Sequence, residues 1–248
     1  MAKGKLIVLE GGDSAGKSTQ CDLITKYFNN NNITYKFLHF PMYGDNEFSE
    51  VISSFLRGGF GKSNEVNPYF VANIYAMDQF LFLPKLKQFL EEYDVVLLDR
   101  YIFSNIAYQG AKYGNDTKES KDIKQWISDF QWGFLNMPYP DLNIFLNVPI
   151  EISKQRLLER KESEQREYLN GKEDIHENDL ELQERVNYNY IQEFTAKPGC
   201  VIINCAKLIT EKSDEIIKDI YWKTLTPENI FYSFINHIES IINVRKSI

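Results

Sequence analysis

Short, nearly continuous apolar runs alternate along the chain with longer segments whose apolar residues recur every three or four positions. The runs are rich in β-branched residues, which is typical of parallel strands buried on both faces. They predict five strands, at residues 5–10, 35–40, 95–99, 142–148 and 201–204. This alternation indicates an α/β fold, in which a five-stranded parallel sheet carries helices on both faces.

The intervening segments have the periodicity of amphipathic helices. One of them places five apolar residues on a single stripe before Pro138, namely Ile123, Trp126, Ile127, Phe130 and Phe134. A last helix is predicted for about residues 226–247, because Thr226 suits the N-cap and Pro227 the first helical position. No stretch has the composition of a linker, so we expect residues 1–248 to form a single domain.

Composition narrows the possible partners. The 248 residues include 28 basic and 35 acidic ones, and the net charge of −7 repels nucleic acid and anionic lipid. No apolar run approaches the ~18 residues of a membrane span, so we expect neither nucleic acid nor a membrane as a partner. Cys21, Cys200 and Cys205 form no paired framework, which favours free thiols and a cytoplasmic location.

The first predicted strand leads into a glycine-rich phosphate-binding pattern. Residues 11–18 satisfy G-x-x-x-x-G-K-[ST], and a helical pattern follows them. The backbone N–H groups of such a loop surround phosphate oxygens at the positive end of a helix. Lys17 is expected to reach the β- and γ-phosphates of ATP, and Ser18 to bind Mg²⁺. The predicted ATP-binding residues are Gly11, Gly12, Asp13, Ser14, Ala15, Gly16, Lys17, Ser18 and Thr19.

A second motif, Asp99-Arg100, stands at the end of the third predicted strand. Ligands bind beyond the carboxyl ends of parallel strands, so Asp99 is expected to orient Mg²⁺ and Arg100 to contact a phosphate. A surface ion pair is the alternative. A GTPase switch would have a D-x-x-G turn at this point and a later N-K-x-D sequence, and neither occurs. The motif therefore favours a kinase over a nucleotide-dependent switch protein.

Four segments, at residues 10–19, 40–41, 99–101 and 104–109, together resemble the thymidylate kinase family. The order and spacing of the motifs match over roughly residues 5–207. Proteins of that family transfer the γ-phosphate of ATP to dTMP on a P-loop kinase fold and are typically homodimers. The resemblance thus implies ATP, Mg²⁺ and dTMP as ligands, a lid that closes over ATP, and a homodimer.

The same resemblance implies roles around the phosphate and sugar of the acceptor nucleotide. Asp13 would accept a hydrogen bond from the 3′-hydroxyl group, and Arg100 would contact the acceptor phosphate. Phe40 and Pro41 would line the acceptor pocket. Tyr108 would crowd the 2′ position of the sugar, which excludes a ribonucleotide, unless it is simply a core aromatic residue.

Residues for the thymine base follow in the same way. Tyr75 would stack on the base, although a core aromatic residue on an amphipathic helix would give the same pattern. Asn105 would read the edge of thymine, within the run that also holds Ser104 and Gln109. Gln79 would contribute a further hydrogen bond to a base carbonyl.

Two positions depart from the family pattern. Gln79 stands where the family usually carries arginine, and Met42-Tyr43 follows Phe40-Pro41 where an arginine often appears. Both departures concern the acceptor and leave the reaction type unchanged. A kinase for another pyrimidine nucleotide or for a deoxynucleoside is therefore the alternative function.

The lid is expected at about residues 156–178. Arg156 and Arg160 lie one helical turn apart and would stabilise the charge of the transferred phosphoryl group, the alternative being a solvated charged helix. Some thymidylate kinases carry this arginine in the phosphate-binding loop, where Ser14 stands here, so the charge would come from the lid. The run 174–179 is typical of an acidic helix start more than of a metal site.

Overall fold

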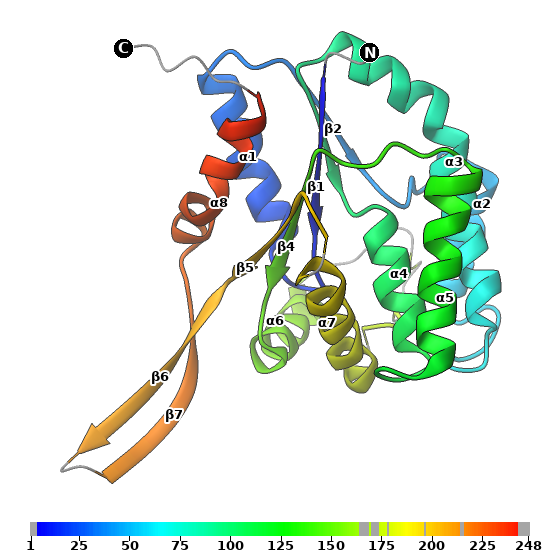
Figure 1. The fold of residues 1–248 in the computed structure, drawn as a ribbon. Coiled ribbons are helices and arrows are strands. Elements are labelled where there is room, and N and C mark those ends of the chain that lie inside the picture. The colour runs from blue at the N-terminus through cyan, green and yellow to red at the C-terminus, as the bar shows by residue number, and fades with distance from the viewer. Residues whose placement is uncertain are drawn as a thin grey trace.

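The computed structural model contains a five-stranded parallel sheet in the order β2-β3-β1-β4-β5 (Figure 1). The five predicted strands are confirmed to within one residue at either end: β1 (Lys5–Glu10), β2 (Tyr35–His39), β3 (Val95–Asp99), β4 (Leu142–Asn147) and β5 (Cys200–Asn204). The structure describes residues 4–163, 169, 174–177, 179–195, 197–213 and 216–242, without the side chains of residues 160–163 and 211–220.

Helices cover both faces of the sheet, as predicted. They are α1 (Lys17–Asn30), α2 (Glu47–Leu56), α3 (Pro68–Glu92), α4 (Ile102–Ala111), α5 (Lys118–Ser128), α6 (Ile150–Ser163), α7 (Leu180–Thr195) and α8 (Pro227–Ile242), with a π-helix (Asp129–Phe134) directly after α5. Alternate strand residues point to opposite faces, so Ile7 and Leu9 pack against α1 and α8. Leu6 and Val8 pack on the other side, in the core with α3, α4, α5 and α7.

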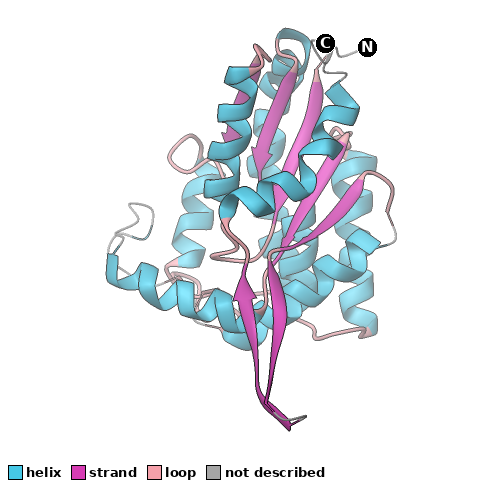
Figure 2. Cartoon of the chain, turned by 90° about the vertical axis from the view of Figure 1, so that its left-hand side faces the viewer, coloured by secondary structure: helices cyan, strands magenta, loops and turns pink. Residues whose placement is uncertain are grey.

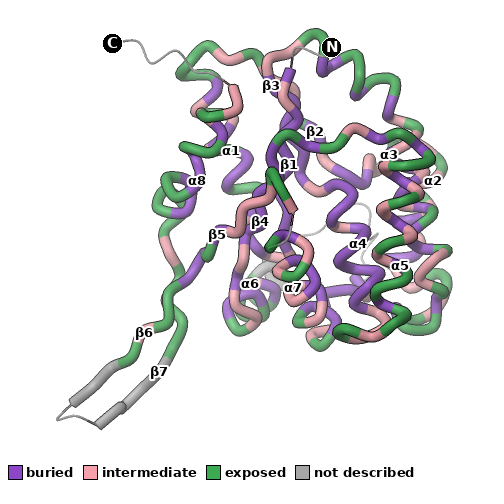
Figure 3. Tube along the Cα trace, in the orientation of Figure 1, coloured by how far each residue is buried: buried purple, intermediate pink, exposed green. Residues whose placement is uncertain are grey.

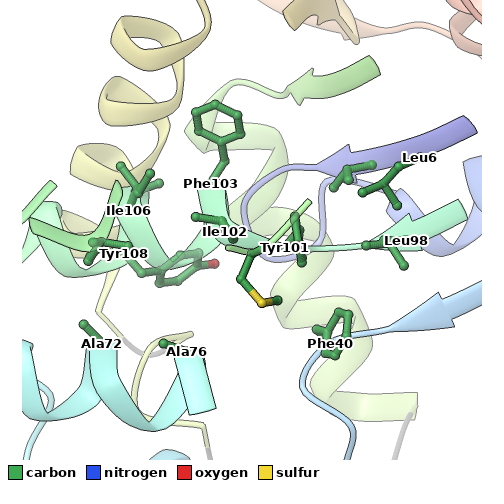
Figure 4. Packing of buried hydrophobic residues seen from close by; sticks show 14 of the residues in the cluster. Leu6, Phe40, Ala72, Ala76, Leu98, Tyr101, Ile102, Phe103, Ile106 and Tyr108 are labelled. Atoms are coloured by element: carbon green, nitrogen blue, oxygen red, sulfur yellow. The ribbon is translucent and has the colours of Figure 1, made fainter. Parts of the chain in front are cut away.

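The three central strands β1, β3 and β4 are buried along most of their length, which is visible as the purple core of Figure 3. The edge strands β2 and β5 each have one buried residue. Figure 4 shows the larger core, where Leu6 and Leu98 of the sheet face Phe40 and residues of α4. Parallel pairing aligns Leu9 with Asp99 and His39 with Asp99. The carboxyl ends of β1, β2 and β3 therefore lie at one edge of the sheet, and the chain from each of them enters the same region.

The prediction that the apolar stripe of α5 continues to Phe134 is wrong. Ile123 and Ile127 are buried on α5, but Phe134 is 76% exposed. The reason is the π-helix, in which Leu135 N–H donates to the carbonyl of Phe130, five residues back, at 2.8 Å. This wider turn rotates Phe134 outward and brings Leu135 into the core in its place.

Two further strands were not predicted. β6 (Ala206–Ser213) and β7 (Ile216–Thr224) form an antiparallel hairpin that projects from the body of the molecule (Figures 1 and 2). Their described side chains include Leu208 and Trp222, which are largely exposed, so no buried apolar run marks the hairpin in the sequence.

The predicted C-terminal helix is confirmed as α8, while residues 243–247 of that prediction lie outside the described residues. Thr226 caps it, since its Oγ1 accepts a hydrogen bond from Asn229 N–H at 3.3 Å. Its apolar face packs on α1, where Tyr27 donates to Glu239 at 2.8 Å. In the part of the chain that the structure describes, no helix combines the length and the apolar character needed to cross a membrane.

Candidate active site

The carboxyl ends of β1, β2 and β3 open into a cavity of about 280 Å³. It gathers segments that are far apart in the sequence, from the glycine-rich loop, the ends of β2 and β3, α3, α4 and residues 174–177. Among the predicted site residues other than Arg160, whose side chain is not described, those that do not line it are Gly11, Gly12, Thr19 and Arg156. The motifs chosen from the sequence therefore converge on one site.

The glycine-rich loop has the backbone that its pattern predicts. Gly16 precedes α1 with a φ of 88°, in the left-handed region that glycine adopts without strain. A Cβ on Gly11 would lie 3.0 Å from Ala15 Cβ and 3.3 Å from the carbonyl oxygen of Leu146, so the loop packs closely on β4. Lys17 lies inside the curve of the loop, where Nζ donates to the carbonyl oxygen of Gly12 at 3.1 Å.

Charged groups surround the Lys17 ammonium. Burial lowers the pKa of Lys17, as does the nearby positive charge of Arg100. Burial raises the pKa of Asp99, but Lys17 and the hydrogen bond with His39 outweigh this effect and lower it overall. Nδ1 of His39 lies 3.4 Å from Oδ2 of Asp99. His39 is thus a site residue that belongs to no recognisable sequence motif.

Arg100 is held in an unusual backbone conformation. Its φ of 68° lies in the left-handed region that costs a non-glycine residue about 1–3 kcal/mol. The buried Glu10 carboxylate secures the turn by accepting from Tyr101 N–H at 3.0 Å and from the Ser104 hydroxyl at 2.6 Å. Tyr190 of α7 donates to the same carboxylate at 2.9 Å. The strained backbone therefore directs the guanidinium group into the cavity.

Asp13 is the centre of the hydrogen-bond network. Its carboxylate accepts from Arg100 Nη2 at 2.6 Å, from the Tyr108 hydroxyl at 2.9 Å and from Gln183 Nε2 at 2.8 Å. Burial raises the pKa of Asp13, but the charges of Arg100 and Lys17 outweigh it and lower the pKa to about 2. Arg100 also donates to the carbonyl oxygen of Gly11 at 2.9 Å. Arg100 is thereby hydrogen-bonded to two residues of the phosphate-binding loop, Gly11 and Asp13.

The far end of the cavity is lined by amide and aromatic side chains. Tyr75, Gln79 and Asn105 face it from α3 and α4. Nδ2 of Asn105 donates to the carbonyl oxygen of Ala72 at 2.9 Å and to Oε1 of Gln131 at 3.0 Å. Oδ1 of Asn105 is buried and accepts no hydrogen bond from a described residue. Asp78 accepts from Met42 N–H at 3.1 Å and so holds the loop that follows Pro41. Because Tyr75, Gln79 and Asn105 carry no charge, we call this the neutral end of the cavity, in contrast to the charged end at the loop.

The predicted lid lies partly outside the described residues, as does the side chain of Arg160. Nη1 of Arg156 donates to the carbonyl oxygen of Ser14 at 3.2 Å, which brings this lid arginine to the phosphate-binding loop. His176 lies against Tyr108, with ring centroids 5.3 Å apart. Burial and the charge of Lys112 lower the pKa of His176 to about 3, so the ring is neutral at pH 7.

Sequence reasoning missed Gln183 as well as His176 and Gln131. Gln183 donates to Asp13 and to the carbonyl oxygen of His176, and so connects α7 to the site. Single amide residues carry no motif, and Gln183 stands 170 positions from Asp13. The acidic run at 174–179 does begin a helix, because Asp179 Oδ1 accepts from Leu182 N–H at 2.9 Å.

These features define a P-loop kinase of small nucleotides. The cavity combines a glycine-rich loop and its lysine with a strand-end carboxylate, Asp99, and an arginine, Arg100, that can bind the phosphate of a second nucleotide. The order of the five strands and the helices on both faces agree with that class. The family model described as thymidylate kinase matches residues 9–216, and the chain belongs to the thymidylate kinase family. It is an enzyme that phosphorylates dTMP to dTDP, and its family is ATP-dependent.

Individual relatives agree with this assignment. The chain is 27% identical to the thymidylate kinase of Plasmodium falciparum over 91% of its own length and 94% of that protein. It is 30% identical to the probable thymidylate kinase of Thermococcus gammatolerans, over 86% and 94%. The solved structure of the Candida albicans thymidylate kinase superposes with a TM-score of 0.68 at 19% identity, covering 99% of this chain and 95% of that one. This last likeness concerns the fold alone.

Proposed function

We propose that the charged end of the cavity binds ATP and the neutral end binds dTMP, so that the γ-phosphate passes between them. The observation that supports this proposal most directly is that Arg100 hydrogen-bonds both Gly11 and Asp13. These contacts connect the cation proposed to bind the dTMP phosphate to the loop proposed to bind ATP. Such coupling fixes the distance between donor and acceptor, and positioning of this kind accounts for much of the catalysis in phosphoryl transfer.

The donor set near Lys17 fits Mg²⁺. Ser18 and Asp99 both line the cavity, and oxygen ligands are those that Mg²⁺ prefers. Oδ1 of Asp99 is buried and accepts no hydrogen bond from a described residue, although the pKa of this carboxyl group is lowered. Ser18 and Asp99 would therefore hold the ion, directly or through water. The ion would neutralise charge on the phosphates of ATP.

The protein groups at the transferred phosphate are cationic. Lys17 would contact the β- and γ-phosphates, and Arg156 would contact the γ-phosphate from the lid. Arg100 would hold the phosphate of dTMP. Negative charge spreads over the phosphoryl oxygens in the transition state, so these cations stabilise it without a covalent intermediate. Thr19 and Arg160 stay predicted site residues, of which Arg160 lies outside the described side chains.

The acceptor roles implied by the resemblance remain proposals that fit the cavity. Tyr75 would stack on thymine, while Asn105 and Gln79 would face its polar edge. Phe40 and Pro41 would enclose the nucleotide, with Ser104 and Gln109 behind it. Asp13 and Tyr108 share a hydrogen bond, which would place both at the sugar.

We also propose a homodimer in the cytoplasm. Phe70 and Leu81 are 45% and 49% exposed and stand eleven residues apart, on the same side of α3. Phe60 extends this apolar surface, with its ring 5.9 Å from that of Phe70. Sedimentation of the wild-type chain should give a dimer, and Leu81→Glu should give a monomer. A wild-type chain that is monomeric at micromolar concentration would contradict the dimer.

The function is tested by acceptor-dependent release of ADP. Purified enzyme with ATP and Mg²⁺ is assayed with dTMP, dUMP, dCMP, UMP and thymidine. We expect stoichiometric dTDP with dTMP, weaker turnover of dUMP, and little turnover of dCMP, UMP or the nucleoside. ADP release that does not depend on any acceptor would instead indicate a nucleotide-dependent switch protein. Preference for thymidine would indicate a deoxynucleoside kinase.

A further inference from the structure

Gln131 is a fully buried polar residue in the π-helix, behind the neutral end of the cavity. It does not line the cavity itself, yet it contacts two residues that do. Oε1 of Gln131 accepts from Nδ2 of Asn105 at 3.0 Å, and Nε2 of Gln131 donates to Oε1 of Gln79 at 2.8 Å. A buried amide with both ends used fixes the orientation of its partners.

The direction of this chain of hydrogen bonds is set by the backbone. The carbonyl oxygen of Ala72 can only accept, so the amide group of Asn105 must turn Nδ2 towards it, at 2.9 Å. The same Nδ2 faces Gln131, which must therefore present its oxygen. The nitrogen of Gln131 then points to Gln79, whose oxygen must accept. Each amide orientation follows from the one before it.

Two polar atoms remain at the cavity end of the chain. Asn105 lines the cavity, and its Oδ1 is buried and accepts no hydrogen bond from the described residues, so this oxygen is the acceptor left for a base that packs against Asn105. Nε2 of Gln79 makes no hydrogen bond with any side chain or backbone group described by the structure, so it offers a donor. The cavity thus presents one acceptor and one donor, in an order that Gln131 maintains.

We propose that Gln131 is a positioning residue that makes the site select a pyrimidine with a donor at N3 and an acceptor at O4. The proposal deepens the proposed function and rests on the base binding at this end. Thymine and uracil have that pattern, and it matches Oδ1 of Asn105 and Nε2 of Gln79. Cytosine has an acceptor at N3 and an amino group at position 4. Its N3 would therefore face the acceptor Oδ1 of Asn105, and its amino group would face the donor Nε2 of Gln79.

Gln131 also allows the site to select its base with an uncharged amide at position 79. An arginine can only donate, whereas Gln79 can donate or accept depending on its orientation. The hydrogen bond from Gln131 removes that ambiguity, because it occupies the oxygen of Gln79. The selectivity of this chain for its base therefore depends on a residue that never touches the nucleotide.

The test is the ratio of kcat/KM for dTMP to that for dCMP in Gln131→Met, which has similar volume but no hydrogen bonds. Gln79 is then free to reverse, and we expect the ratio to fall about tenfold. The change should lie in KM for dTMP, with kcat within about twofold, because Gln131 is remote from the phosphates. Gln192→Met, on the exposed face of α7, is the control and should leave the ratio unchanged.

A double-mutant cycle separates positioning from general loosening of the core. Adding Gln131→Met to Gln79→Met should lower the ratio little further, since the oriented side chain is already gone. If both nucleotides lose activity equally, or if the two effects add, the role of Gln131 is merely structural. Gln131→Leu serves the same purpose if Gln131→Met does not fold. Wild-type enzyme that ignores dTMP would instead overturn the proposed function.

Discussion

Replacing Asp13 by asparagine removes the negative charge at the centre of the site while keeping its shape. The pKa of Asp13 falls from an ordinary value of 3.8 to about 2 in the folded protein. At about 1.4 kcal/mol per pKa unit, ionised Asp13 stabilises the fold by about 2 kcal/mol at neutral pH. Because the folded pKa is depressed, this contribution is present above pH 4 and is lost as the pH falls towards 2. At pH 3 about 1 kcal/mol remains.

The assay is urea unfolding of wild type and Asp13→Asn at pH 7 and pH 3. The difference in unfolding free energy between the two proteins should shrink by about 1 kcal/mol at the lower pH. Asp22→Asn, on the exposed side of α1, is the control and should change stability by less than about 0.5 kcal/mol at either pH. An equal cost of Asp13→Asn at both pH values would refute the reasoning that Arg100 and Lys17 hold this carboxylate ionised.

Three further substitutions test the catalytic assignments. Lys17→Ala should lower kcat by about 10²–10³ in a coupled ADP assay. Lys26→Ala, exposed on α1, is the control and should leave kcat unchanged. Near-normal turnover by a folded Lys17→Ala would exclude the phosphate role of Lys17. Arg156→Ala should lower kcat by at least about tenfold and leave the temperature of thermal unfolding unchanged. The exposed Lys154→Ala is measured as the control. Lower stability with normal turnover would show that Arg156 has a structural role instead. Tyr108→Ala should raise kcat/KM for UMP relative to dTMP, and equal use of both by wild type would contradict a sugar gate.

The parallel sheet could be predicted because a strand that is buried on both faces is a continuous apolar run in the sequence. A run such as residues 95–99 is apolar up to Asp99, where the chain meets the site. The hairpin and the π-helix left no such record. The described strand residues of the hairpin are largely exposed, and the wider turn at residues 129–134 depends on how Leu135 packs in the folded core.

The site could be predicted where neighbouring residues act together, as in the loop at residues 11–18 and in Asp99-Arg100. Spacing within a motif is visible in the sequence, so these two motifs were found. His39 and Gln183, which contact Asp99 and Asp13 but belong to no motif, were missed. The amide network was not predictable, because Gln79, Asn105 and Gln131 come from three separate helices and meet only after folding. The orientation of each amide depends on a backbone carbonyl, which no side-chain pattern records.

The β6–β7 hairpin leaves and re-enters the body of the protein at nearly one point. Leu225 N–H donates to the carbonyl oxygen of Cys205 at 2.9 Å, and Ala206 pairs with Thr224. A short turn between residues 205 and 225 would therefore preserve the path from β5 to α8, which packs on α1. In terms of chain connectivity, the two ends of the hairpin are already held together, so a change in its length would leave the nucleotide-binding body in place.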